Sequence, residues 1–337
     1  MRGYHVAIVG ATGLVGRTML QVLQERNFPV SVLTLLASRN SEGKQIQFRD
    51  EQHTVKELHE SSFANVDFAL FSAGSPISIR YAPIAAAANA FAIDNSSAWR
   101  LHKNVPLIVP EVNAKAMRKL NGDLKSRIIA NPNCSTIQLA VALYPLHKKY
   151  KIKRIVVSTY QSVTGAGQRG AEQLASELMN RPVEHPKFPH PIAFNCIFHD
   201  FPYEDGYTSE EFKMIHEMKK IFHFDGLPIT ATCVRIPVTG GHSESVNIEF
   251  EKKCSPEEAR TLLAASKGII VQDDPKNDIY PMPVNAAGRD EVFVGRIRED
   301  ATVRYGLNMW VVADNLRKGA ATNAIQIAEK LIEMGLA

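Results

Sequence analysis

The stretch His5-Val-Ala-Ile-Val-Gly10-Ala-Thr-Gly13-Leu-Val-Gly16 decides the fold of the first part of the chain. Residues 5–9 form a continuous apolar run, as in strands that a parallel sheet buries on both faces. A glycine-rich turn follows, and residues 14–25 have the pattern of a helix that stops before Pro29. The order of strand, glycine turn and helix predicts the first unit of a doubly wound α/β domain.

Strands and helices continue to alternate after this unit. Strands are predicted at residues 30–36, 66–72 and 90–93, with an alanine-rich helix at 79–89. From residue 128 the predicted strands become longer and are separated by helices at 171–179 and 210–222. These later strands are expected at residues 154–160, 229–238, 245–250, 291–297 and 308–313.

This pattern predicts an α/β fold with two domains. The first is a doubly wound, Rossmann-like dinucleotide-binding domain of residues 1–130, completed by a C-terminal helix within residues 316–337. The second is an α+β domain of residues 131–315.

The glycine turn has the features of a phosphate-binding loop. Gly10, Gly13 and Gly16 permit a tight turn, close approach of backbone N–H groups to a pyrophosphate, and close packing of the helix on the strand. The helix N-terminus adds unpaired N–H groups that attract an anion. The first glycine step is one residue longer than in the usual dinucleotide fingerprint, so a plain glycine-rich turn is the alternative.

The end of the second strand indicates which dinucleotide is bound. Enzymes that use NAD usually carry a carboxylate there for the ribose hydroxyls. This chain has Ser38 and Arg39 instead, and no carboxylate comes before Glu42. Arginine and hydroxyl donors suit a 2′-phosphate, so we predict NADP as the cofactor. An arginine on a solvated loop is the alternative interpretation of Arg39.

Composition argues against several classes of protein. The chain has 337 residues, of which 45% are hydrophobic and 22% charged, as is usual for globular proteins. The formal net charge of +4 is spread without a lysine or arginine block, which gives little support for binding to nucleic acid or a membrane surface. No apolar run approaches the roughly 18 residues of a membrane span. The N-terminus lacks the pattern of a signal peptide, so we expect a cytoplasmic protein.

One of the four cysteines has the setting of a nucleophile. The four are too scattered for a disulfide framework, and no His, Cys and carboxylate cluster has metal-ligand spacing, so we expect no metal. Cys134 lies in Asn131-Pro-Asn-Cys-Ser-Thr-Ile-Gln138, between a predicted strand at 127–130 and a predicted helix at 135–144. A helix N-terminus presents unpaired N–H groups that favour a thiolate. A buried structural cysteine is the alternative for Cys134 and the expectation for the other three.

A candidate acid/base lies in Cys233-Val-Arg-Ile-Pro-Val-Thr-Gly-Gly-His-Ser-Glu244. Arg235 ends one predicted strand and His242 precedes the next, so both side chains can lie at one end of the sheet. Histidine has an unperturbed pKa of ~6.5, which suits proton transfer near neutrality. His242 is the best candidate among 11 histidines, with a structural histidine as the alternative.

Taken together, these motifs make the chain resemble the aspartate-semialdehyde dehydrogenase family. The resemblance covers nearly the full chain, and Trp99 before Arg100 and Thr239-Gly240 before Gly241 are small departures that alter no chemical group. The matching blocks are Gly10-Ala-Thr-Gly-Leu-Val-Gly16, Phe71-Ser-Ala-Gly74, Asp94-Asn-Ser-Ser-Ala-Trp-Arg100, Val109-Pro-Glu-Val-Asn113, Asn131-Pro-Asn-Cys-Ser-Thr136, Thr159-Tyr-Gln161, Arg235-Ile-Pro-Val238, Gly241-His-Ser-Glu244 and Asp314-Asn-Leu-Arg-Lys-Gly319.

The resemblance implies roles for individual residues. It implies that Cys134 is the acyl-accepting nucleophile, that Gln161 orients the intermediate and that His242 is the acid/base. The residues implied for the cofactor are Gly10, Thr12, Gly13, Val15, Gly16, Ser38, Arg39, Ser72, Gly74 and Asn315.

Four further residues are implied to bind the substrate. Arg235 and Glu210 would hold its carboxylate and ammonium groups, and Arg100 and Lys213 would bind the phosphate. The stretch Thr208-Ser-Glu-Glu211 has the pattern of a capping box, and positions 210, 213 and 217 share one helix face. A solvated ion pair is the alternative for Glu210 and Lys213.

The implied activity is reductive dephosphorylation of L-aspartyl 4-phosphate to L-aspartate 4-semialdehyde by NADPH, through a thioacyl intermediate on the cysteine. This reaction belongs to the biosynthesis of lysine, diaminopimelate, methionine and threonine, and homodimers are usual in the family. A relative that binds NADP or a partner protein without turnover is one alternative, and replacement of Cys134 or His242 would mark it.

A second alternative is N-acetyl-glutamyl phosphate reductase, which shares the fold, the cysteine and the hydride chemistry. That family typically has Tyr-Pro-Thr after the nucleophile, whereas this chain has Ser135-Thr-Ile137. Glu210 also suits a free ammonium group, which an acetylated substrate lacks.

Overall fold

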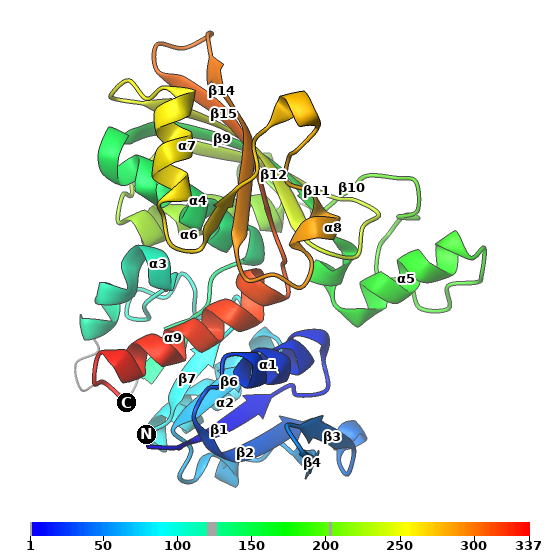
Figure 1. The fold of residues 1–337 in the computed structure, drawn as a ribbon. Coiled ribbons are helices and arrows are strands. Elements are labelled where there is room, and N and C mark those ends of the chain that lie inside the picture. The colour runs from blue at the N-terminus through cyan, green and yellow to red at the C-terminus, as the bar shows by residue number, and fades with distance from the viewer. Residues whose placement is uncertain (1, 120–126, 202–203) are drawn as a thin grey trace. The chain divides into compact units, whose positions relative to one another are not determined.

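The computed structural model describes residues 2–119, 127–201 and 204–337 (Figure 1). The chain divides into two compact units, one of Met1–Asn133 with Ala320–Ala337 and the other of Cys134–Gly319. The domain limits expected from the sequence, at residues 130 and 316, lie a few residues before these divisions.

The N-terminal unit contains a six-stranded parallel sheet in the order β5-β2-β1-β6-β7-β8. Its strands are β1 (Tyr4–Val9), β2 (Val30–Ala37), β5 (Lys56–Glu57), β6 (Phe68–Phe71), β7 (Phe91–Asp94) and β8 (Ile128–Ala130). The chain runs in one direction along the sheet from β1 to β2 and in the other from β1 through β6 to β7. This order confirms the predicted doubly wound fold.

Helices cover both faces of this sheet. The helices are α1 (Leu14–Glu25), α2 (Ser75–Ala87), α3 (Pro110–Asn113) and α9 (Thr322–Glu333). Right-handed crossovers in opposite directions place α1 and α2 on opposite faces. Helix α9, from the end of the chain, lies beside α1, and Arg26 binds Glu329 through Nε and Nη2 at 2.8 and 2.6 Å (Figure 1).

Glycine is required at two positions of the turn between β1 and α1. Gly10 has a φ of +89°, and a Cβ there would lie 2.8 Å from the carbonyl oxygen of Ser72. A Cβ on Gly16 would lie 2.3 Å from the carbonyl oxygen of Gly10. A side chain at either position would therefore force the backbone apart.

The C-terminal unit contains a seven-stranded mixed sheet in the order β10-β11-β9-β12-β15-β14-β13. The strands are β9 (Ile152–Gln161), β10 (Ile197–Phe198), β11 (Ile229–Arg235), β12 (His242–Phe250), β13 (Ile269–Val271), β14 (Val292–Asp300) and β15 (Gly306–Ala313). The helices are α4 (Cys134–Tyr150), α5 (Gln168–Leu178), α6 (Ser209–Phe222), α7 (Pro256–Ala264) and α8 (Pro283–Ala286).

One face of this sheet is packed and the other is partly open. Helices α4, α6 and α7 contact the strands from one side (Figure 1). Along β9, β12 and β15, residues that face these helices are buried, and alternate residues on the other face are half-buried or exposed. Tyr160, Asn247 and Trp310 are examples of this second group. Such alternation is typical of a sheet with one core face.

The start of the last helix and a short hairpin are among the features that differ from the sequence prediction. The last helix does not run without interruption from residue 316, because a π-helical turn at Arg317–Ala321 precedes α9. The Asp314 carboxylate accepts hydrogen bonds from the N–H groups of Leu316 and Arg317. A short hairpin of β3 (Gln45–Phe48) and β4 (Glu51–Thr54) was not predicted.

No helix in the described ranges is both long and apolar enough to cross a membrane. Over the same ranges, no group of three or more His, Cys, Asp or Glu side chains is arranged to hold a metal ion.

Candidate active site

The candidate site lies where four strands of the C-terminal sheet begin or end. Strands β9 and β11 are parallel, and their last residues, Gln161 and Arg235, are paired. Strand β12 is antiparallel to β9, so its first residue, His242, reaches the same end of the sheet. The end of β15, Ala313, pairs with His242. The strand order thus gathers residues that are distant in sequence.

Cys134 is the first residue of α4 and lies against His242. The distance from Cys134 Sγ to His242 Nε2 is 3.1 Å, although the residues are 108 positions apart. Gly319 also lies against Cys134, since a Cβ at that position would lie 2.9 Å from Cys134 Cβ. A thiol at a helix start in contact with an imidazole is the arrangement that a nucleophile and an acid/base partner require.

The surroundings of His242 determine which ring nitrogen carries the proton. The backbone N–H of Ser162 donates to Nδ1 at 3.0 Å, so Nδ1 is an acceptor and the neutral ring carries its proton on Nε2. Complete burial, together with the Arg235 cation, lowers the pKa of His242 to about 3. The ring is therefore neutral at pH 7 and presents an N–H donor to Cys134 Sγ.

Gln161 connects the strand end to α4 and α6. Its Nε2 lies 2.9 Å from Ser135 Oγ and 3.2 Å from Glu210 Oε1. Its Oε1 is buried and has no hydrogen-bond partner among the described residues. An unpaired buried acceptor is costly, so this oxygen is a candidate contact for a bound molecule.

Helix α6 supplies an ion pair whose carboxylate is buried and whose ammonium group is half-buried. The predicted capping box is present, since Thr208 and Glu211 exchange side-chain-to-backbone hydrogen bonds. Glu210 Oε2 lies 3.1 Å from Lys213 Nζ. The Glu210 side chain is only 8% exposed and that of Lys213 31%, which argues against the solvated ion pair considered from the sequence.

Arg235 lies near His242 and also contacts His199, a histidine that the sequence patterns do not single out. Its Nη1 donates to the carbonyl oxygen of Ser162 at 2.7 Å, and its Nη2 lies 3.4 Å from His199 Nδ1. His199 follows the two-residue strand β10 in a segment without a recognisable motif. Only the pairing of β10 with β11 brings His199 to Arg235, so no local signal in the sequence could have found it.

The remaining predicted residues lie in two places. Arg100 belongs to the N-terminal unit, where its Nε and Nη2 donate to the carbonyl oxygens of Asn131 and Asn95. Asn315 follows β15 in the C-terminal unit and bonds to Thr164 Oγ1. The other residues predicted for the cofactor belong to the N-terminal unit and lie at the ends of three strands; they are Gly10, Thr12, Gly13, Val15, Gly16, Ser38, Arg39, Ser72 and Gly74.

The other three cysteines have different surroundings. Cys233 is buried in β11, and burial raises the pKa of its thiol well above the usual range. Burial also raises the pKa of Cys254 to about 11. Cys196 is exposed, so burial does not support the structural role expected for this cysteine. Cys134 is the cysteine that contacts His242.

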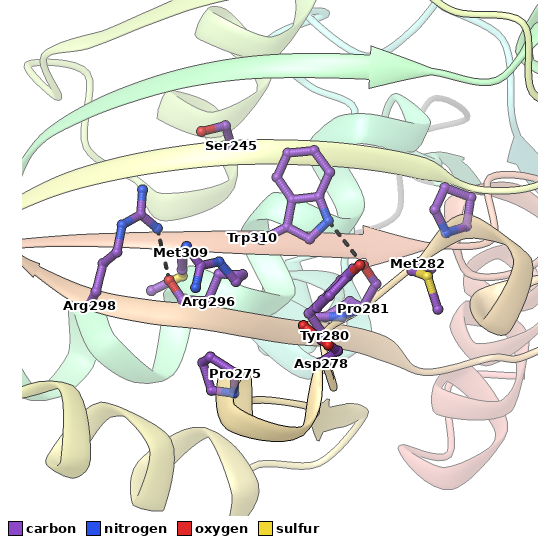
Figure 2. Close-up of a pocket in the computed structure, with 11 residues that line it drawn as sticks. Ser245, Pro275, Asp278, Tyr280, Pro281, Met282, Arg296, Arg298, Met309 and Trp310 are labelled. Carbon is purple, nitrogen blue, oxygen red and sulfur yellow. Dashed lines mark hydrogen bonds between the residues drawn. The ribbon is translucent and has the colours of Figure 1, made fainter.

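A cavity of about 500 Å³ lies elsewhere in the C-terminal unit, on the partly open face of the sheet (Figure 2). Trp310 and Ser245 line it from β15 and β12, and the Trp310 Nε1–H donates to the carbonyl oxygen of Pro281 at 3.1 Å. None of the residues around Cys134 lines this cavity.

Comparisons with known proteins match both parts of the chain. Residues 5–120 match the family model described as "Semialdehyde dehydrogenase, NAD binding domain", and residues 143–318 match "Semialdehyde dehydrogenase, dimerisation domain". Aspartate-semialdehyde dehydrogenase of Aquifex aeolicus is 56% identical over 99% of each chain, and that of Bacillus subtilis is 47% identical over 99% of each. The Vibrio cholerae aspartate semialdehyde dehydrogenase II, solved in complex with ASA, superimposes with a TM-score of 0.94 at 46% identity, over 99% of each chain.

Proposed function

Because the chain belongs to the aspartate-semialdehyde dehydrogenase family, we propose that it interconverts L-aspartyl 4-phosphate and L-aspartate 4-semialdehyde, with NADP as cofactor and Cys134 as nucleophile. The contact between Cys134 Sγ and His242 Nε2, at 3.1 Å, carries this proposal. In this contact a thiol at a helix start lies beside a neutral N–H donor. Acyl transfer to sulfur requires such a nucleophile and such a hydrogen-bond donor.

In the reductive direction, the Cys134 thiolate attacks the acyl carbon of the acyl phosphate. The carbon–sulfur bond forms, the carbon–oxygen bond to phosphate breaks, and inorganic phosphate leaves. NADPH, when bound, supplies the hydride that reduces the resulting thioester. The hydride adduct then releases the aldehyde and returns the electron pair to Cys134 sulfur.

His242 acts on the oxygen of the reacting carbonyl in this scheme. Its Nε2–H is beside Sγ, so the same N–H group can bond to the oxyanion that develops on the neighbouring acyl carbon. The bond from the Ser162 N–H to Nδ1 keeps this donor in place. Because the ring is neutral at pH 7, it stabilises the oxyanion by a hydrogen bond rather than as an imidazolium ion.

Gln161 and the charged side chains hold the substrate. The unpaired Oε1 of Gln161 supports its role in orienting the acyl intermediate. Glu210 and Arg235 are both buried, and their opposite charges suit the ammonium and carboxylate groups of an amino acid. Lys213, next to Glu210, and Arg100 are the proposed ligands of the phosphate.

The residues at the turn between β1 and α1 fit a dinucleotide. Gly13 is the N-cap of α1, and no side chain caps the N–H groups of that helix. Ser72 Oγ is buried without a hydrogen-bond partner among the described residues, next to Gly10. Ser38 and Arg39, exposed after β2, are the proposed contacts of a 2′-phosphate and hence the reason to favour NADP over NAD.

We also propose that the protein is a cytoplasmic homodimer. The match of residues 143–318 to a dimerisation domain supports a second copy of this chain as its partner, and the partly open face of the sheet is our candidate for the contact. All four cysteines are free, as is usual in a reducing compartment.

The test of the function is the formation of NADPH from aspartate semialdehyde, phosphate and NADP. The unmodified protein should be active, and Cys134→Ser should lose at least about 10³-fold in kcat because a hydroxyl is far less ionised than a thiol. Cys233→Ser is the matched control and should retain activity. Equal losses of kcat in the two variants would show that Cys134 is not the nucleophile.

The same assay distinguishes the neighbouring family of N-acetyl-glutamyl phosphate reductases. With an amide in place of the ammonium, Glu210 would remain buried without its substrate partner, at a cost of several kcal/mol. We expect at least about 10³-fold higher kcat/KM for aspartate semialdehyde than for N-acetyl-glutamate semialdehyde. Comparable values would show that the substrate is wrong.

A further inference from the structure

His199 contacts Arg235, but the proposed mechanism assigns no role to His199. Strand β10 pairs with β11 so that Ile197 lies opposite Arg235, and His199 follows two residues later. The imidazole Nδ1 lies 3.4 Å from Nη2 of Arg235, at the long end of the hydrogen-bond range. The His199 ring therefore adjoins the guanidinium group that we assign to the substrate carboxylate.

The contact with Arg235 identifies the free end of the His199 ring. A guanidinium group only donates hydrogen bonds, so Nδ1 of His199 accepts and the neutral ring carries its proton on Nε2. This Nε2 is buried and has no partner in the part of the chain that the structure describes. A histidine with a purely structural role would be expected to place this N–H against a protein acceptor, because leaving a buried donor unpaired destabilises the fold.

The charges around His199 keep its ring neutral. Burial is the main influence, Arg235 and Lys213 act in the same direction, and Glu210 and Asp200 oppose them. The result is a pKa lowered to about 4. At physiological pH the ring is therefore a neutral donor in a setting that contains two cations.

We propose that the Nε2–H of His199 binds the α-carboxylate of the substrate beside Arg235 and thereby contributes to substrate specificity. This inference rests on the proposed function, since it assigns a further residue to the same site. The carboxylate is favoured over the phosphate because His199 contacts Arg235 directly, whereas only its charge interaction links it to Lys213. A neutral N–H donor next to a guanidinium group complements an anionic oxygen without adding another charge to the pocket.

Three substitutions separate the two ends of the ring. His199→Gln keeps an N–H donor near the position of Nε2, His199→Asn keeps a polar group near Nδ1, and His199→Leu removes both. His190→Leu is the matched control, because His190 is an exposed histidine in the same segment. The readouts are kcat and the separate KM values for aspartate semialdehyde and phosphate in the assay above. Thermal denaturation of each variant checks that it is folded.

We expect His199→Leu and His199→Asn to raise the KM for aspartate semialdehyde roughly 10- to 100-fold, as for the loss of a hydrogen bond to a charged group. The KM for phosphate and kcat should change little, and His199→Gln and His190→Leu should resemble the unmodified enzyme. If His199→Leu does not fold, the difference in KM for aspartate semialdehyde between His199→Gln and His199→Asn still tests the inference.

Three results would overturn the inference. An unchanged KM in His199→Leu would show that the contact is not used. Recovery by Asn but not by Gln would show that His199 only positions Arg235 through Nδ1. A rise confined to the KM for phosphate would assign the donor to the other anion.

A separate measurement, on the unmodified protein, tests the proposed function. This function fails if the unmodified protein forms no NADPH in the assay. Calorimetric binding of aspartate semialdehyde to Cys134→Ala protein, with and without each His199 substitution, then tests the carboxylate contact without turnover. Equal affinities across that series would overturn the inference, and a 10- to 100-fold loss in the Leu and Asn variants would uphold it.

Discussion

Arg39 is the residue on which the proposed cofactor preference depends. It lies exposed directly after β2, where an NAD enzyme would carry a carboxylate. We expect the unmodified protein to prefer NADP, and Arg39→Ala to narrow its preference in kcat/KM by about 1–3 kcal/mol, as for a charged hydrogen bond. Lys115→Ala, at another exposed cation of the same unit, should leave the preference unchanged. Equal use of both cofactors by the unmodified protein would refute this interpretation of the loop.

The buried carboxyl group of Glu244 should make the stability of the protein depend on pH. This side chain is completely buried in β12, and the Gln138 side chain offsets only part of the effect of that burial on the carboxyl group. Burial raises the pKa of Glu244 well above its ordinary value of 4.5. The folded protein therefore keeps this proton at pH values where the unfolded chain has lost it.

It follows that the free energy of unfolding falls as the pH rises above about 4.5, through the contribution of Glu244. Glu244→Gln removes this contribution. The difference in Tm between the variant and the unmodified protein should increase in favour of the variant from pH 5 to pH 8, measured by thermal denaturation. Glu257→Gln, at an exposed side chain of α7, is the control. A difference that is constant over this pH range would mean that Glu244 is ionised in the folded protein.

Among the elements, the turn Val163–Ala166 between β9 and α5 lies against Arg235 and His242. A Cβ on Gly165 would lie 2.7 Å from Arg235 Nη1 and 3.1 Å from His242 Nε2. Gly165→Ala should therefore displace both side chains, and we expect kcat/KM to fall by about 10²-fold, as for a displacement of roughly 1 Å in an active site. Gly226→Ala is the control, because a Cβ there meets nothing closer than 3.4 Å. Full activity of Gly165→Ala would show that the site tolerates this displacement.

Local sequence patterns were sufficient for the elements whose limits are set by local chemistry. Helix α1 has the predicted limits, residues 14–25, because the glycine turn begins it and Pro29 follows it. The hairpin of β3 and β4 was missed because Gln and Glu dominate its strands, which have little β propensity. The sequence pattern does not predict the π-helical turn before α9, because the Asp314 carboxylate binds the backbone at the start of that turn.

The candidate site was predictable only in part for a related reason. Cys134 was identified by its place at a strand-to-helix junction, and His242 by its place at a strand start. Their contact depends on the order of β9, β12 and β15, which the sequence does not specify locally. His199 had no such junction or motif, and it was overlooked until the pairing of β10 with β11 placed it beside Arg235.

For the whole molecule, the partly open sheet face is the proposed contact between two copies. Ser245 is exposed on this face, beside the cavity that Trp310 also lines (Figure 2). Ser245→Arg adds a bulky charge and should shift the protein from dimer to monomer at micromolar concentration, measured by sedimentation equilibrium. Ser31→Arg, at an exposed serine of the N-terminal unit, should leave the dimer intact. A Ser245→Arg protein that remains fully dimeric would place the interface elsewhere.

The proposed mechanism requires a covalent acyl group on Cys134, and an assay without phosphate can detect this group. With NADP and aspartate semialdehyde alone, hydride transfer should proceed but phosphate cannot discharge the thioester. We expect a burst of about one NADPH per chain, and mass spectrometry should find an aspartyl group on the peptide that contains Cys134. Addition of phosphate should then remove this group. Absence of a burst, or an acyl group on another cysteine, would contradict the account.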